Sequence, residues 1–319
     1  MLDNFIGLKV VETELVSIEE FVLEFKKQVE QKKFPIRIKI DEGPDIKNLK
    51  IGNKNFVDYL CGITSAQNIE IETDNLLQDH KRIKIIKFFN ELPFLCHQNY
   101  IANSKKFQRK FMHFVGNHRW PRFVLSHFLY KDHKAESFLT YWFANHLDKS
   151  PPELLDCMSQ KDINEHYKIL PLKIDTKEQY NHDGYIDWEH TKPLLEFYDN
   201  AFLDIVCETW HEGSTFMPTE KIARPMACMN PFIVYGPKYF LKNLKKLGFK
   251  TFEKFWSEDY DDVTGKERIK LIKDLVSTLA EISYKDTQRL YEKLLPTLQH
   301  NKKIYNSLTK SQIMSVFDN

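Results

Sequence analysis

The sequence contains few cysteines, and none of them lies at a metal-binding spacing. Its five cysteines are scattered over 319 residues without a C-x-x-C motif. An odd number of widely separated cysteines predicts neither a disulfide framework nor a zinc site. The pattern is typical of reduced thiols in an intracellular protein.

Long apolar runs and an excess of one charge are also missing. No stretch approaches the roughly 18 apolar residues of a membrane span, and the opening residues lack the apolar core of a signal peptide. The 46 basic and 45 acidic residues nearly cancel, so no global charge attracts nucleic acid or a membrane. We therefore expect a cytoplasmic protein without a membrane partner.

The most informative stretch, residues 201–249, alternates between apolar runs and polar segments. Apolar residues 202–207 and 232–235 predict two buried strands, each followed by a loop and a helix. Thr219 is a suitable N-cap for the first helix, and Gly248 suits the end of the second. This order predicts parallel strands with crossover helices, in which ligands bind at the carboxyl ends of the strands.

Two cations stand near the start of the first of these helices. Lys221 and Arg224 are three residues apart, so they share a helix face near the positive end of the helix dipole. A phosphate between them would relieve their repulsion, and free backbone N–H groups would help to bind it. The alternative is that both side chains extend into solvent. Pro225 predicts a kink in this helix, or a single turn that ends and restarts.

A specific motif runs through the same stretch. It consists of Glu208, Thr219-Glu220-Lys221, Arg224-Pro225, and the run PFIV at 231–234 with Gly236. The motif resembles the nucleotide-sugar half of α1,3-fucosyltransferase-like glycosyltransferases. It is more similar still to uncharacterised, often phage-encoded proteins with a TEK…RP…PFIV.G pattern. The resemblance implies a GT-B-like α/β fold, in which two Rossmann-like domains face a cleft and helices follow at the C-terminal end.

The resemblance also implies an activity. In the resembling enzymes the pair that corresponds to Glu220 and Lys221 binds the ribose and diphosphate of the donor. We therefore expect a glycosyltransferase that moves a sugar from a nucleotide-diphosphate donor to an acceptor hydroxyl. The donor is a co-substrate, and no cofactor is implied. Glu-Thr-Trp follows the strand where the family has Glu-Asn-Ser, so the donor base and sugar stay open.

A second polar group follows the apolar run at 111–116. Asn117, Arg119 and Arg122 stand at the start of a helix whose first turn suits Pro121. This is again an arrangement that binds anions. In the resembling proteins an arginine here contacts the donor diphosphate, so we expect Arg119 or Arg122 to face Lys221 across the cleft. Each of them could instead be an ordinary surface arginine.

The flanking segments suggest three parts. We expect an acceptor-side α/β domain at 1–107, a nucleotide-sugar-binding Rossmann-like domain at 108–262, and helices at 263–319 that pack back on the body. Ser17 and Glu20 predict a capping box at the first helix. The basic run KKFQRK favours a linker, with an acceptor-binding edge as the alternative. Pro296 predicts a break in the last long helix.

A short acidic pattern, Asp259-Tyr260-Asp261, matches the DxD that binds Mn²⁺ in other glycosyltransferases. It lies outside the donor stretch, so we expect a surface loop, no metal site and metal-independent transfer. A base in the first domain should deprotonate the acceptor. The candidate bases are Asp41, Glu42, Asp45, Asp79 and Glu91. The residues available to stack on the donor base are Tyr180, Tyr185 and Trp188.

Two further questions stay open at this point. The chain could be a nucleotide-binding or structural protein that kept the donor fold and lost transfer. The acceptor could be a glycan, a protein or a modified DNA base. The phage-type resemblance suggests the DNA base, and with it a viral protein in the host cytoplasm. A basic stripe on the first domain would favour DNA.

Overall fold

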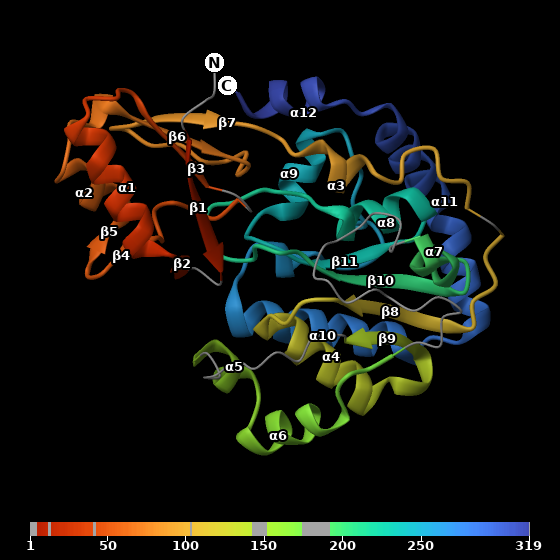
Figure 1. Ribbon diagram of the computed structural model, residues 1–319. Helices are drawn as coiled ribbons and strands as arrows, with labels where there is room; N and C mark the ends of the chain where they lie inside the picture. Colours follow the sequence, from red (N-terminus) through yellow and green to blue (C-terminus); the bar gives the residue numbers. More distant parts are fainter. Residues whose placement is uncertain are drawn as a thin grey trace. The chain divides into compact units, whose positions relative to one another are not determined.

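The computed structural model describes residues 5–11, 14–40, 43–102, 104–141, 152–173 and 192–318 (Figure 1). The chain forms two compact units. Unit 1 comprises Met1–Glu91, Thr209–Met217 and Thr309–Asn319, and unit 2 comprises Leu92–Glu208 and Pro218–Leu308. The nine-residue segment Thr209–Met217 therefore interrupts unit 2 in sequence and belongs to unit 1.

Unit 1 is built on a five-stranded sheet in the order β2-β1-β3-β6-β7. The strands are β1 (Phe5–Val11), β2 (Glu14–Val16), β3 (Ile36–Ile40), β6 (Ile69–Thr73) and β7 (Lys84–Lys87). All neighbours pair in parallel except β1 and β2. The remaining elements are α1 (Ile18–Glu30), the hairpin β4 (Lys50–Ile51) and β5 (Lys54–Asn55), α2 (Phe56–Cys61), the short 3-10 helix η1 (Ala66–Asn68) and α12 (Lys310–Phe317).

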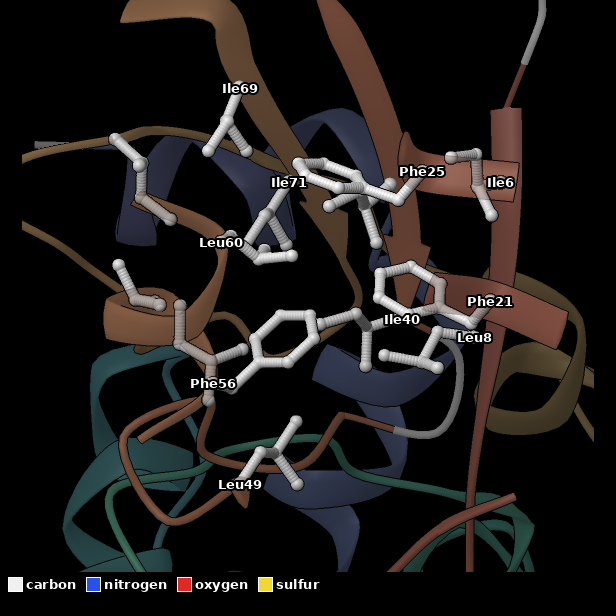
Figure 2. Packing of buried hydrophobic residues seen from close by; sticks show 14 of the residues in the cluster. Ile6, Leu8, Phe21, Phe25, Ile40, Leu49, Phe56, Leu60, Ile69 and Ile71 are labelled. Carbon is white, nitrogen blue, oxygen red and sulfur yellow. The ribbon is translucent and has the colours of Figure 1, made fainter. Parts of the chain in front are cut away.

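The core of unit 1 lies between this sheet and helices α1 and α2. Strand β3 alternates buried isoleucines with partly exposed basic residues, which is the pattern of a half-exposed strand. Figure 2 shows Phe21 and Phe25 of α1 together with Phe56 of α2 among isoleucines of β3 and β6. The segment 209–217 contributes Trp210 to the same core.

Unit 2 contains a four-stranded parallel sheet in the order β11-β10-β8-β9 (Figure 1). The strands are β8 (Arg109–Val115), β9 (Ser137–Tyr141), β10 (Ala201–Cys207) and β11 (Phe232–Tyr235). The helices are α3 (Glu91–Leu95), α4 (Trp120–Asp132), η2 (Lys134–Glu136), α5 (Pro152–Cys157), α6 (Gln160–Ile169), α7 (Lys192–Tyr198), α8 (Glu220–Cys228), α9 (Phe240–Lys246), η4 (Asp259–Asp261), α10 (Gly265–Glu281) and α11 (Tyr284–Ser307). Every residue of β10 and β11 is buried, so both faces of these strands are covered.

These elements confirm the α/β class predicted from the sequence. Two α/β units with parallel sheets, and helices at the C-terminal end of the chain, are the parts that a GT-B-like fold requires. The strand, loop and helix order predicted for 201–249 is also confirmed. Gly248 has a φ of +91°, which explains why glycine ends α9.

Two predictions about helix ends were wrong. Ser17 has a left-handed backbone, with φ of 59°, and makes no side-chain cap bond, because a capping side chain needs an extended backbone. Helix α11 continues through Pro296, since Leu294 and Leu298 are buried on either side of it. The helix ends instead before Thr309, which forms a capping box with Gln312.

The interpretation of the basic run at 105–110 as a linker was also wrong. Its last two residues begin β8, and the side chains of Lys105 and Lys110 are buried. The Lys105 ammonium donates to the carbonyl of Tyr198 at 2.9 Å, and the Lys110 ammonium lies 2.6 Å from the carboxylate of Glu136. Both lysines therefore stabilise unit 2 from within, because buried charges must be paired.

Candidate functional site

The topology of unit 2 identifies one place where a ligand is expected. From β8 the chain forms β9 on one side of the sheet and then returns to form β10 on the other side. In open α/β sheets, ligands bind at the carboxyl ends of the strands where the order reverses in this way. The described parallel strands of unit 1 show no such reversal. Strands β3, β6 and β7 follow one another on the same side of β1, and β2, on its other side, is antiparallel.

On the β10 side of this reversal, Glu208 and Thr219 are hydrogen-bonded to each other. The Glu208 carboxylate accepts the Thr219 hydroxyl at 2.6 Å and the Thr219 N–H at 3.3 Å. The Thr219 side chain also caps α8 by accepting the N–H of Lys221 at 3.3 Å, as the sequence predicts. Glu208 is buried, and this burial raises its pKa. The Glu208–Thr219 pair therefore joins the residues on either side of the segment 209–217 and positions the start of α8.

Lys221 is the partly exposed cation of this group. Its side chain is 15% exposed, and its ammonium lies 2.5 Å from the carboxylate of Glu220 and 3.3 Å from the Thr219 hydroxyl. Burial by itself would raise the pKa of Glu220, but the charges of Lys221 and Arg224 outweigh burial, so this pKa is lowered. A charged pair thus stands in the first turn of α8, at the carboxyl end of β10.

Arg224 lies in a different environment from Lys221, although both are on α8. It is only 7% exposed, and its charge acts on Asp204 of β10 and Tyr198 of α7. Burial raises the pKa of Asp204 to about 6, against the opposing effect of Arg224. Helix α8 is unbroken from Glu220 to Cys228, so the predicted single turn that ends and restarts at Pro225 was wrong.

The β8 side of the reversal contains the other predicted residues. Asn117 is exposed, and Arg119 is partly exposed at the N-cap of α4, where its guanidinium donates to the carbonyl of His118 at 3.2 Å. Arg122 is buried and donates to the carbonyl oxygens of Asn117 at 2.9 Å, Cys207 at 3.3 Å and Glu208 at 3.2 Å. The structure therefore brings the two predicted groups together, with Arg122 joining the strand ends.

Sequence reasoning missed the buried histidines beside these residues. A ring nitrogen of His113 lies 2.6 Å from the carbonyl of Ile205, and burial lowers the pKa of His113 to about 4. Burial, followed by the charges of Arg119 and Arg122, lowers the pKa of His118 to about 4 as well. The position of His113 inside an apolar strand was the available signal, since only a satisfied or neutral histidine suits such a place.

The acidic pattern at 259–261 has a structural use. Asp261 is buried, which corrects the expectation of a surface loop, whereas Asp259 is exposed. The Asp261 carboxylate accepts the N–H of Leu241 at 3.1 Å and of Lys242 at 3.3 Å, and so caps α9. Among the described residues, no group of three or more His, Cys, Asp or Glu could hold a metal ion.

The candidate bases in unit 1 differ in their surroundings. The Asp45 carboxylate is buried and accepts the N–H of Ser214 at 2.9 Å and of Lys47 at 3.0 Å. Asp79 and Glu91 are exposed. Asp74, which follows β6 directly and is buried, was passed over in the sequence. The following candidates lie outside the described residues: Asp41, Glu42, Tyr180, Tyr185 and Trp188.

Comparison with known proteins identifies a similar solved structure but no similar family or curated protein. No protein-family model matches the chain, and no curated protein matches it. The crystal structure of a glycosyltransferase from Rickettsia africae ESF-5 is similar over 98% of this chain and 74% of its own. The two share 10% sequence identity, and the TM-score is 0.48. Among the helices of the described ranges, none combines the length and the apolar character needed to cross a membrane.

Proposed function

We propose that this protein is a glycosyltransferase that uses a nucleotide-diphosphate sugar as donor. The observation that carries the proposal is the position of Lys221, a partly exposed cation in the first turn of α8, at the point where the strand order reverses. Free N–H groups and the helix dipole favour a phosphate at such a helix start. The motif that contains Lys221 is the one that resembles the nucleotide-sugar half of fucosyltransferase-like enzymes.

In this proposal the residues of unit 2 have separate roles. Lys221 and Arg119 stabilise the negative charge of the leaving diphosphate, without a requirement for a metal. Glu220 orients Lys221 and binds the donor ribose. Glu208, Thr219 and Arg122 hold the two loops in place, because their polar groups bond to the protein itself. The acceptor hydroxyl belongs to a glycan, a protein or a modified DNA base.

One observation favours a second function, that of a nucleotide-binding protein without transfer activity. Glu220 already neutralises Lys221, and the Glu208 carboxylate is occupied by Thr219. Release of nucleoside diphosphate from a nucleotide sugar, measured without acceptor, separates the two functions. Slow release supports the enzyme, and binding without release supports the second function.

The test of the site is calorimetric titration of GDP, UDP and their sugar conjugates into the wild type and Lys221→Gln. Glutamine keeps a side-chain donor next to the buried Glu220 carboxylate, whereas alanine would remove this partner. Losing the charge should weaken binding by about 10- to 150-fold, since a charge-assisted bond contributes roughly 1.5–3 kcal/mol. Lys221→Arg should recover part of this loss.

The matched control is Lys285→Ala, which removes an exposed lysine from α11 in the same unit. Its donor affinity should equal that of the wild type. A Lys221→Gln variant that folds normally and binds every donor as tightly as the wild type would contradict the proposal.

A further inference from the structure

One segment of unit 2 carries a strong local excess of positive charge. Residues 238–254 contain six lysines and a single acid, Glu253, and all six lysines are exposed. Glu253 pairs with Lys245 at 2.6 Å, and the segment as a whole contains five more basic than acidic residues. The whole chain has 46 basic and 45 acidic residues, so this basic segment departs from the average of the protein. Such a segment attracts a polyanion.

An exposed aromatic ring lies within this basic segment. Tyr239 is 40% exposed, and the ammonium groups of Lys238 and Lys242 lie 4.9 and 5.0 Å from the centre of its ring. Its φ is +66°, in the left-handed region that bulky residues avoid at a cost of roughly 1–2 kcal/mol. Glycine would suit this backbone better, so the position retains a tyrosine side chain despite the strain.

A buried polar cluster holds Tyr239 in this conformation. The Tyr239 N–H donates to the carbonyl of Asp261 at 2.9 Å, and the Asp261 carboxylate accepts the N–H groups of Leu241 and Lys242. The buried guanidinium of Arg268 donates to the Asp261 carbonyl at 2.8 Å. The ring is therefore presented from a rigid base, which lowers the entropic cost of binding through it.

The apolar residues of α9 decide between two kinds of polyanion. Phe240, Leu241 and Leu244 are buried within the protein. No apolar face of α9 is left to enter a lipid bilayer, as an interfacial helix requires. An exposed aromatic ring among lysines is instead the combination that binds single strands, in which phosphates meet the lysines and an unpaired base stacks on the ring.

We propose that the basic segment 238–254 binds single-stranded nucleic acid. Lys238 and Lys242 then move from the Tyr239 ring to the phosphates, and the ring stacks on a base. This surface lies outside the α8 motif, and the inference does not depend on the proposed glycosyltransferase activity. The balanced charge of the whole chain does not by itself suggest a nucleic-acid partner.

The test is fluorescence anisotropy with a labelled oligothymidylate of about 15 nucleotides and a duplex of equal length. The wild type should prefer the single strand. Tyr239→Ala should weaken this binding by about 5- to 150-fold, whereas Tyr239→Phe should not change it. Alanine keeps the Cβ atom, so the backbone strain at this position is the same in wild type and variant.

The lysines are tested by the salt dependence of binding. The double variant Lys238→Ala/Lys242→Ala should weaken binding and reduce the slope of log K against log salt by about 1.4, because each phosphate contact contributes about 0.7. The matched control is Lys285→Ala/Lys293→Ala, which removes two exposed lysines from α11 and should leave affinity and slope unchanged.

Three results would overturn the inference. The first is absence of oligonucleotide binding at low salt by the folded wild type. The second is equal binding of duplex and single strand with no effect of Tyr239→Ala, which is the behaviour of a general polyanion surface. The third is binding to vesicles of anionic phosphatidylserine without binding to the oligonucleotide.

Discussion

The two halves of the unit 2 sheet differ in the buried groups whose charge changes in acid. The half formed by β8 and β9 buries His113, His118 and Arg122, and burial lowers the pKa of all three. The half formed by β10 and β11 buries carboxyl groups, and burial raises the pKa of Asp204 and Glu208. Acid therefore charges His113 and His118 in the first half and neutralises the two carboxyl groups in the second.

This difference separates scaffold from binding groups at the sheet edge. The buried groups in both halves bond to the protein itself, as Arg122 and Glu208 do. Lys221 and Arg119, next to them, also bond to the protein but present part of their side chains to solvent, where a ligand can reach them. Burial thus distinguishes residues of the same charge that lie within a few positions of each other.

Arg122→Ala should have the largest effect on stability, because Arg122 connects the two halves of the sheet. Two buried carbonyl groups, of Cys207 and Glu208, and the carbonyl of the exposed Asn117 would lose this donor, and bonds from a charged donor contribute roughly 1.5–3 kcal/mol each. We expect a loss of about 3 kcal/mol of stability, measured as a fall of the melting temperature by about 6–12 °C. Arg119→Ala is the control and should shift melting by less while weakening donor binding. Equal melting shifts in the two variants would contradict the assigned roles.

Acid pH should destabilise the histidine half more than it stabilises the carboxyl half. His166 of α6 is buried against Phe123, and burial lowers its pKa to about 3 from 6.5. Below pH 6.5 this histidine binds a proton in the unfolded chain but stays neutral in the folded protein. The stability of the fold therefore falls as the pH decreases below 6.5. His166→Phe should remove about 2 kcal/mol of this loss near pH 5. The measurement is melting at about pH 7.5 and about pH 5.

Asp204→Asn tests the opposite effect of acid, which is expected in the carboxyl half of the sheet. The folded pKa of Asp204, about 6, exceeds its ordinary value of 3.8, so protonation between these values favours the folded state. Removing this group should make the loss of stability in acid steeper. A His166→Phe variant whose melting follows pH in the same way as the wild type would refute the contrast between the halves.

Asp261→Ala tests whether the acidic pattern is structural or binds a metal. Loss of the cap on α9 should cost about 1–2 kcal/mol, whereas Asp259→Ala should change stability by less than about 0.5 kcal/mol. Transfer should survive EDTA in the wild type. Loss of transfer in EDTA, restored by Mn²⁺, would instead assign a metal to Asp259 and Asp261.

Tyr239→Gly should have the smallest effect, and of opposite sign. Glycine adopts the left-handed backbone without the cost of a Cβ atom, so we expect the variant to be more stable by about 1 kcal/mol. The same variant should lose affinity for the single-stranded oligonucleotide. A lower melting temperature would show that the ring contributes more to packing than its exposure indicates.

Local patterns determined much of unit 2. The apolar runs at 202–207 and 232–235 predicted strands covered on both faces, because no polar residue interrupts the second and only Asp204 the first. Thr219 and Gly248 predicted the ends of two helices, because capping depends on residues close in sequence. The motif around Lys221 was also visible without a structure.

Tertiary contacts decided which of these polar groups are buried. Arg122 and Arg119 are indistinguishable by local pattern, and Arg122 is buried because carbonyl groups 85 and 86 residues away accept its bonds. Asp261 became the cap of α9 through a contact across 20 residues. A sequence shows which side chains carry charge, but the partners that compensate burial come from distant strands, so only the folded chain separates scaffold from candidate ligand-binding groups.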